Sequence, residues 1–230
     1  MAEDLNPYHI CTWDNESDCR NCQIEGELHC KWDSRVLGAF IGISLPATLM
    51  TIFMLVVIGL MTGGWWPLVA YIAYVIVAFI IVENKALCSH CPYYSQETAF
   101  LKCLANNGFP RIWKYDPKPI NALERFWFWG PTVAGTFLVW PLAVMAYGIW
   151  LMSANSAQYG QIALVSFILL GASNLLASVA FYVALRAFFC SQCVNFSCQF
   201  NTVAKEVVDA YLEKNPVMRE AWEKTGYKLG

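Results

Sequence analysis

Two long blocks of this sequence contain no acidic or basic residue and no histidine, and they constrain the fold more than any other feature. They run from Val36 to Val82 and from Phe126 to Leu185. A helix needs roughly 20 apolar residues to cross a hydrocarbon layer about 30 Å thick, so each block has room for two crossings. Charged residues make up only 14% of the chain, against about 25% in a typical soluble domain. The sequence therefore predicts an all-α integral membrane protein with four transmembrane helices.

Turn-forming residues divide each charge-free block near its middle. Gly63 and Gly64, ahead of Pro67, divide the first block, and the small, polar stretch 153–160 divides the second. Residues of these types end helices and form tight connections. We therefore expect helices at about 36–61, 65–83, 126–152 and 161–187, paired as two hairpins. These boundaries divide the chain into an arm at 1–35, a hairpin at 36–83, a loop at 84–125, a second hairpin at 126–187 and a tail at 188–230.

The basic residues predict the orientation in the membrane. All 15 lysines and arginines lie in the arm, the central loop and the tail or at their borders, and the two turns carry no charge. Four crossings place these three segments on one side, and the positive-inside rule makes that side the cytoplasm. We expect a multi-pass protein of the cell (inner) membrane with both termini cytoplasmic. With a net charge of −2, the chain lacks the basic footprint of a nucleic-acid binder.

All ten cysteines lie in the same predicted cytoplasmic segments. Thiols stay reduced in the cytoplasm, so structural disulfides are not expected there. Clustered thiols in that compartment indicate metal binding or redox chemistry. Cys11, Cys19, Cys22 and Cys30 have the symmetric spacing C-x7-C-x2-C-x7-C. Four thiolates this close can surround one tetrahedral ion and fold an arm that has little core of its own.

Two further cysteine groups share one pattern. Each predicted hairpin leads into a C-S-x-C motif that follows a basic residue, and one more cysteine lies downstream. Repeated hairpins of the same topology favour an internal duplication about an axis along the membrane normal, which would bring the two motifs together. The two groups are Cys88, Cys91 and Cys103, and Cys190, Cys193 and Cys198.

The grouping of ligands stays open at the level of sequence. The two pairs can form one four-cysteine site, or each group of three can bind its own ion with a fourth ligand from elsewhere, such as His90 or an arm cysteine. His90 can equally be a polar residue of the interface. Zinc suits paired C-x2-C motifs and is the expected metal. An iron–sulfur cluster is the alternative, because ferredoxin-type cysteine runs end in a Cys-Pro pair like Cys91-Pro92. No C-x2-C-x2-C run is present, however.

Three functions are compatible with these features. The first is a non-catalytic or accessory subunit that docks a cytoplasmic protein partner or joins a larger membrane complex. Such a role is favoured over transport, because pumps and transporters place charged residues inside the membrane and the charge-free blocks contain none. The second is an iron–sulfur electron-transfer subunit that links a cytoplasmic redox partner to membrane quinone. The third is a quinone-coupled thiol–disulfide oxidoreductase that uses a C-x2-C pair. Whether the protein is an enzyme stays open.

The loop and the tail carry local patterns of their own. We expect a short helix over Tyr94–Leu104, and a capping box of Asn121 and Glu124 at the start of the third membrane helix. Beyond Cys198, the apolar residues Val203, Val207 and Tyr211 recur at helical spacing. This pattern predicts a C-terminal amphipathic helix.

Overall fold

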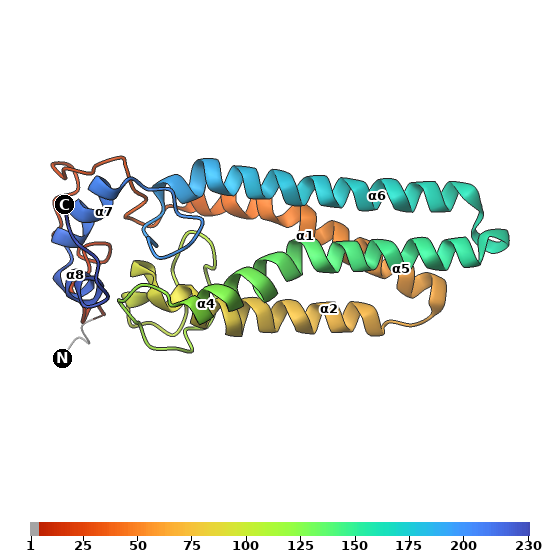
Figure 1. Ribbon diagram of the computed structural model, residues 1–230, viewed down its shortest axis with the longest axis horizontal. Helices are drawn as coiled ribbons and strands as arrows, with labels where there is room; N and C mark the ends of the chain where they lie inside the picture. The colour runs from red at the N-terminus through yellow and green to blue at the C-terminus, as the bar shows by residue number, and fades with distance from the viewer. Residues whose placement is uncertain (1–4) are drawn as a thin grey trace.

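The computed structural model describes residues 5–230, a part of the chain that contains helices and, apart from one isolated bridge, no β-structure. Four helices in it are long and apolar enough to cross a membrane: Ser34–Thr62, Trp66–His90, Ala122–Ala154 and Ser156–Gln192. This confirms the predicted multi-pass helical membrane protein. Figure 1 shows the four spans side by side in an elongated bundle, with the described part of the N-terminal arm, the central loop and the C-terminal tail at the same end.

Three of the four spans combine α-helix with wider π-helical turns. The first span is the single helix α1 (Ser34–Thr62). The second consists of α2 (Trp66–Ile76), π-helical η1 (Val77–Glu83), α3 (Asn84–Ala86) and η2 (Cys88–His90). The third consists of α4 (Ala122–Trp127), π-helical η4 (Phe128–Val139) and α5 (Trp140–Ala154). The fourth consists of α6 (Ser156–Ala184), π-helical η5 (Leu185–Phe189) and η6 (Cys190–Gln192).

The ends of the spans follow from capping residues. Gly63 ends α1 in the left-handed conformation, with φ of 69°, which glycine adopts without steric cost. The predicted capping box is present: Asn121 accepts from the backbone of Glu124, whose side chain accepts in return. The third span therefore begins at Ala122 rather than at 126. Gly160 interrupts the start of α6 with φ of 75° and ψ of 168°, so its regular part begins close to the predicted 161.

Close contact between α5 and α6 depends on two glycines. A Cβ atom added to Gly148 would lie 2.2 Å from the ring of Phe167, and one added to Gly171 would lie 2.5 Å from the sulfur of Met145. Each glycine thus accepts a large side chain from the opposite helix. Small residues at such positions let membrane helices approach closely enough for van der Waals packing to hold them.

Enlarging the first of these glycines is expected to destabilise the bundle. Gly148→Val should cost about 1–3 kcal/mol or more, because Phe167 has to leave its place and the helices have to separate. Thermal unfolding in mild detergent measures the loss. The matched control is Gly42→Val on α1, where a new Cβ meets nothing within 4 Å. Equal losses in the two variants would contradict the packing argument.

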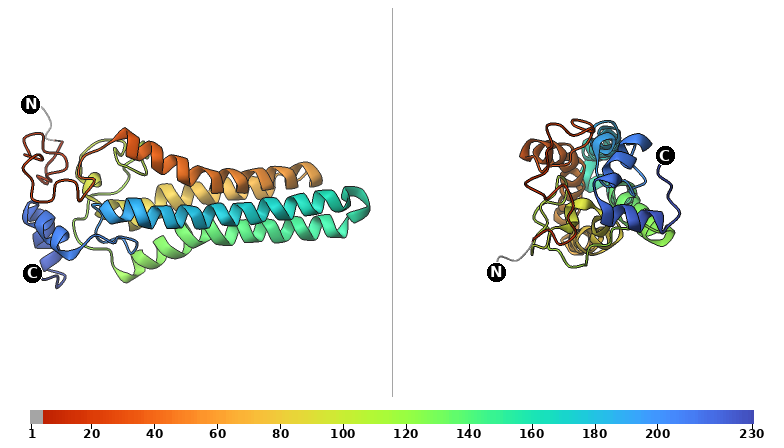
Figure 2. Two further views of the ribbon diagram at one scale, coloured as in Figure 1. Left: turned by 90° about the horizontal axis from the view of Figure 1, so that it is seen from above. Right: turned by 90° about the vertical axis from the view of Figure 1, so that its left-hand side faces the viewer.

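Apart from the two turns, the described residues outside the spans form a small folded unit, which we call the cap (residues 5–33, 91–121 and 193–230). Helices α7 (Lys205–Glu213) and α8 (Pro216–Glu223) belong to it, and the predicted amphipathic helix is confirmed. Figure 2 shows the cap across one end of the bundle. The three segments share one hydrophobic core, which contains Ile10, Ile24, Leu28, Tyr93, Tyr94, Leu101, Tyr115, Val194, Val208, Tyr211, Leu212, Met218 and Trp222.

The expected helix over Tyr94–Leu104 is wrong. Only the short 3-10 turn η3 (Pro92–Ser95) forms there. The backbone beyond it pairs instead with the chain that returns after the turn at Gly108: Leu101 donates to the carbonyl of Phe109 at 2.8 Å, and Arg111 donates to that of Ala99 at 2.9 Å. These bonds use backbone groups that a helix over the same residues would need for its own hydrogen bonds. The paired chain and the helix therefore exclude each other.

Candidate cysteine site between the bundle and the cap

A cavity of about 900 Å³ lies between the spans where they meet the cap. Its walls include residues from all four spans, among them Phe40, Phe79, Val133 and Val179. Towards the two turns, the bundle is instead filled by a tightly packed core of Met54, Leu55, Ile58, Tyr71, Val144, Met152 and Phe167. The bundle is therefore solid at the turn end and hollow at the cap end.

Six of the ten cysteines line this cavity. They are Cys88, Cys91, Cys103, Cys190, Cys193 and Cys198, so the fold brings both C-S-x-C motifs and both downstream cysteines to one place. A hydrogen bond of 3.1 Å from the Asn195 side chain to the carbonyl of Leu87 ties the two motif loops together. The thiols on the two sides are close enough to influence one another, because Cys193 and Cys198 both contribute to raising the pKa of Cys91.

A buried carboxyl group lies beside these thiols. Glu83 lines the cavity and is 9% exposed. The side-chain nitrogen of Asn106 lies 3.0 Å from Oε1 of Glu83 and 3.3 Å from the sulfur of Cys88. The backbone nitrogen of Asn106 lies 3.0 Å from the sulfur of Cys103. Sequence reasoning missed Glu83, because the first charge after an apolar block resembles an ordinary membrane-interface residue; that position was its only signal.

Burial disfavours the thiolate form of the four cavity cysteines that lie outside the spans. It raises the pKa of Cys91, Cys193 and Cys198, and it raises the pKa of Cys103 to about 11. Desolvation is the largest cause in each case, since it disfavours the charged thiolate. The hydrogen bonds to Cys103 and Cys193 act in the opposite direction but are weaker. A reactive cysteine needs an environment that lowers its pKa, so these four need a nearby cation before they become thiolates at neutral pH.

The arm cysteines form a separate group. Burial, followed by the charges of Cys11, Cys22 and Cys19, raises the pKa of Cys30 to about 12, which places the four within electrostatic range of one another. The ammonium group of Lys31 organises the loop, because it donates to the carbonyl groups of Cys11 at 2.9 Å and of Asp14 at 2.8 Å. As the described residues form it, the lining of the cavity includes none of these four cysteines.

The cysteines are gathered but not arranged around an ion. All ten are free thiols. Among residues 5–230, no three histidine, cysteine, aspartate or glutamate side chains converge as a bound metal would hold them. The fold therefore brings thiols together from separate segments, and their final grouping would depend on what they bind.

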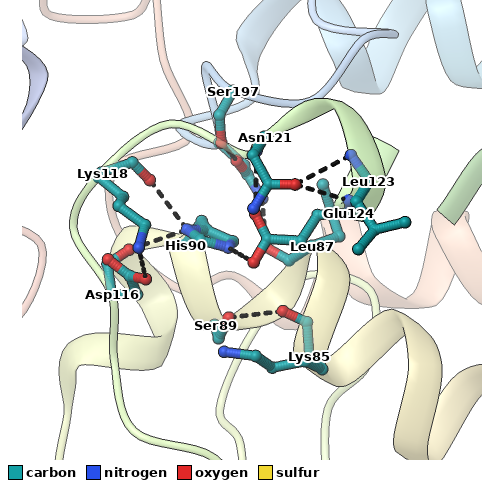
Figure 3. A network of polar contacts seen from close by, with 11 residues as sticks. Lys85, Leu87, Ser89, His90, Asp116, Lys118, Asn121, Leu123, Glu124 and Ser197 are labelled. Atoms are coloured by element: carbon teal, nitrogen blue, oxygen red, sulfur yellow. Dashed lines mark hydrogen bonds and ion pairs between the residues drawn. The ribbon is translucent and has the colours of Figure 1, made fainter. Parts of the chain in front are cut away.

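His90, a candidate ligand in the first motif, connects the cap to the bundle (Figure 3). Its Nδ1 lies 2.8 Å from the carbonyl oxygen of Lys118 and 3.1 Å from that of Asp116. Its Nε2 lies 3.3 Å from a carboxylate oxygen of Glu124, within ion-pair distance but outside hydrogen-bond alignment. Since both ring nitrogens face oxygen atoms, metal ligation by His90 would require it to give up one of these contacts.

Removal of this imidazole is expected to loosen the start of the third span. His90→Ala should lower the unfolding free energy by about 1–3 kcal/mol, because it leaves partly buried oxygen atoms without their partner. Chemical or thermal unfolding in detergent measures the change. Gln192→Ala is the matched control, since Gln192 holds the same position in the second motif and its side-chain bond to Gly26 is exposed. A loss no larger than that of the control would show that His90 does not cross-link the fold.

No protein-family model matches this chain, and neither a curated protein nor a solved structure is detectably similar to it. Three features of the molecule itself bear on its function: the two cysteine groups, the apolar cavity, and the buried carboxyl group beside it.

Proposed function

We propose that this protein is a metal-bearing membrane subunit whose cap docks a protein partner. The observation that carries the proposal is the gathering of six cysteines, from two regions about a hundred residues apart, on one cavity. Thiolates are the preferred ligands of structural zinc. A bound cation would also supply the positive charge that these buried thiols lack, because a coordinating thiol is deprotonated outright. Zinc is the proposed ion, and an iron–sulfur cluster is the alternative.

The proposed ligands form two sites. Cys88, Cys91, Cys190 and Cys193 hold the first ion, with Cys103, Cys198 and His90 beside it as further donors. The arm cysteines Cys11, Cys19, Cys22 and Cys30 hold the second. No three of these side chains converge on one point among residues 5–230, so metal binding would have to draw them inward.

The orientation and the origin of the bundle belong to the same proposal. The lysines and arginines lie at the cap end of the spans, which supports a cytoplasmic cap on an inner-membrane protein. The shared C-S-x-C motifs support two hairpins derived by duplication. The acidic side chains of Asp14, Glu16 and Glu25 are exposed on the arm, where they offer a basic protein partner a complementary surface.

Metal analysis with an absorption spectrum tests the proposal, on protein purified without oxygen in mild detergent. Zinc at one or more ions per chain, with no visible colour, is the expected result. Iron with sulfide and broad visible absorption would replace the docking subunit by an electron-transfer subunit. Protein that is folded and free of metal after growth in zinc-replete medium would overturn the proposal.

A second function is favoured by the free thiols that face an apolar cavity between the spans. In a quinone-coupled thiol–disulfide oxidoreductase, Cys88 and Cys91 would form a disulfide and lose two electrons and two protons. The quinone would accept both and leave as quinol. Counting free thiols after anaerobic incubation with a fully substituted quinone tests this function. An unchanged count would exclude it.

A further inference from the structure

We propose that the cavity is a binding site for a lipid-soluble quinone, with a ring oxygen of the quinone against the carboxyl group of Glu83. The inference goes beyond the metal proposal and does not depend on it, since it concerns the apolar walls and one carboxyl group rather than the thiols. It gives the quinone of the second function a binding site, but it requires no oxidation of thiols. Ligand sites are concave and mostly apolar, with a few polar groups that fix orientation. The size of the cavity, about 900 Å³, is within the range of such sites.

The cavity opens towards lipid. Ile41, Leu138 and Val179 line it and are also exposed, by 46%, 51% and 58%. They come from the first, third and fourth spans, so the openings lie between helices inside the apolar zone. A molecule that is dissolved in the bilayer can enter there without crossing water. The apolar walls suit its tail, whereas a water-soluble ligand would have to give up its hydration.

Aromatic side chains surround the cap end of the cavity. The ring of Phe200 lies 5.8 Å from that of Phe128, 5.3 Å from that of Trp129 and 5.6 Å from that of Tyr182. All four residues line the cavity. Aromatic rings favour offset-stacked or edge-to-face contacts with one another. This end therefore suits a flat ring rather than a flexible acyl chain.

Glu83 supplies the polar contact that such a ring needs. Its Oε1 is satisfied by Asn106, whereas its Oε2 is buried and has no hydrogen-bond partner among the described residues. Ionising a carboxyl group in apolar surroundings without a paired cation is very costly, and no lysine, arginine or histidine of residues 5–230 forms an ion pair with it. The neutral group carries its proton on Oε2 and needs an acceptor. A quinone carbonyl provides one.

Asn106 makes this contact testable by substitution. Its side-chain N–H donates to Oε1, so a glutamine at position 83 would turn its oxygen towards Asn106 and its amide N–H towards the cavity. Glu83→Gln therefore keeps a donor in place, and Glu83→Leu removes it at similar volume. A second pair of variants tests the walls. Ala134→Phe places an extra ring in the cavity, which Ala134 lines, and Ala146→Phe is the control on the same span, at an exposed residue outside the lining.

The experiment measures binding of a fully substituted decyl-benzoquinone to the purified full chain in mild detergent, by saturable quenching of tryptophan fluorescence. We expect Ala134→Phe and Glu83→Leu each to weaken binding about tenfold or more. The first obstructs the site, and the second removes a buried hydrogen bond. Glu83→Gln and Ala146→Phe should stay within about threefold of the wild type. Thermal unfolding confirms that each variant is folded.

Three outcomes would overturn the inference. Equal affinity in all four variants would place the quinone in the detergent or at another surface. Weak binding by Glu83→Gln, as weak as by Glu83→Leu, would remove the donor role of residue 83. Displacement of the quinone by a saturated fatty alcohol of the same chain length, at equal concentration, would make the cavity a site for acyl chains.

Discussion

Replacement of Cys91 and Cys193 together by serine is expected to remove one metal ion per chain and to unfold the cap at a much lower temperature. These two residues come from different motifs and lie on one cavity, so the double change takes a ligand from each side of the proposed site. Structural zinc contributes on the order of 10 kcal/mol to the folding of small domains. Even half of this would lower the unfolding midpoint by about 10–20 °C in a chain of this size.

The matched control for this double variant is Ser191→Ala. Ser191 lies in the same turn as Cys193, and its hydroxyl group donates to the carbonyl of Ala187 within its own helix. This change should leave both the metal content and the midpoint close to those of the wild type. Metal analysis and thermal unfolding on the same samples connect the two effects. Full metal content in the double variant would show that the ion is held by other residues.

The second large effect is a loss of stability at alkaline pH in metal-free protein. Burial raises the pKa of Cys103 to about 11 and that of Cys30 to about 12, from an ordinary value of 9.0. In the unfolded chain these thiols lose their protons near pH 9, whereas in the folded chain they keep them. Rising pH therefore favours the unfolded state, and stability that is complete below pH 9 falls between pH 9 and about 12. Each pKa unit is worth about 1.4 kcal/mol, so the loss amounts to several kcal/mol.

Unfolding midpoints between pH 7 and 11, with and without a chelator, measure this effect. The metal-loaded protein should show a flatter dependence over the same range, because its ligand thiols have already lost their protons. Cys103→Ser should reduce the slope in the metal-free protein, since serine does not titrate there. A slope that is unchanged by this substitution would mean that other buried groups dominate, the first candidates being Tyr115 and Tyr211, whose pKa values burial also raises.

The spans were predictable because the membrane imposes a length and a composition that a single sequence displays directly. The capping box at Asn121 was predictable for a similar reason, since its two members are only three residues apart. The cavity was not, because it results from how side chains on four separate helices fail to fill the space between them. The role of Glu83 depends in turn on Asn106, 23 positions along the chain, and no local pattern connects the two.

The loop shows where a local pattern misleads. Residues 94–104 carry enough apolar side chains for a helix, but their backbone groups bond to the chain beyond Gly108. For His90 the sequence left a metal ligand and a polar interface residue equally open. The structure turns its ring towards Asp116, Lys118 and Glu124, and metal ligation by His90 stays a prediction. Tertiary contacts, which no local pattern shows, set both the loop and the ring.

The shared core of the cap sets an order of events during synthesis. Thr12 in the arm bonds to Tyr211 at 2.9 Å, and the backbone of Cys11 donates to Asn215 at 2.8 Å, so a segment made before the first span is completed by one made after the fourth. Until the tail emerges from the ribosome, the arm and its thiols stay open to chaperones, metal donors and proteases. A chain that stalls after the fourth span would therefore be inserted in the membrane with an arm that lacks its packing partners.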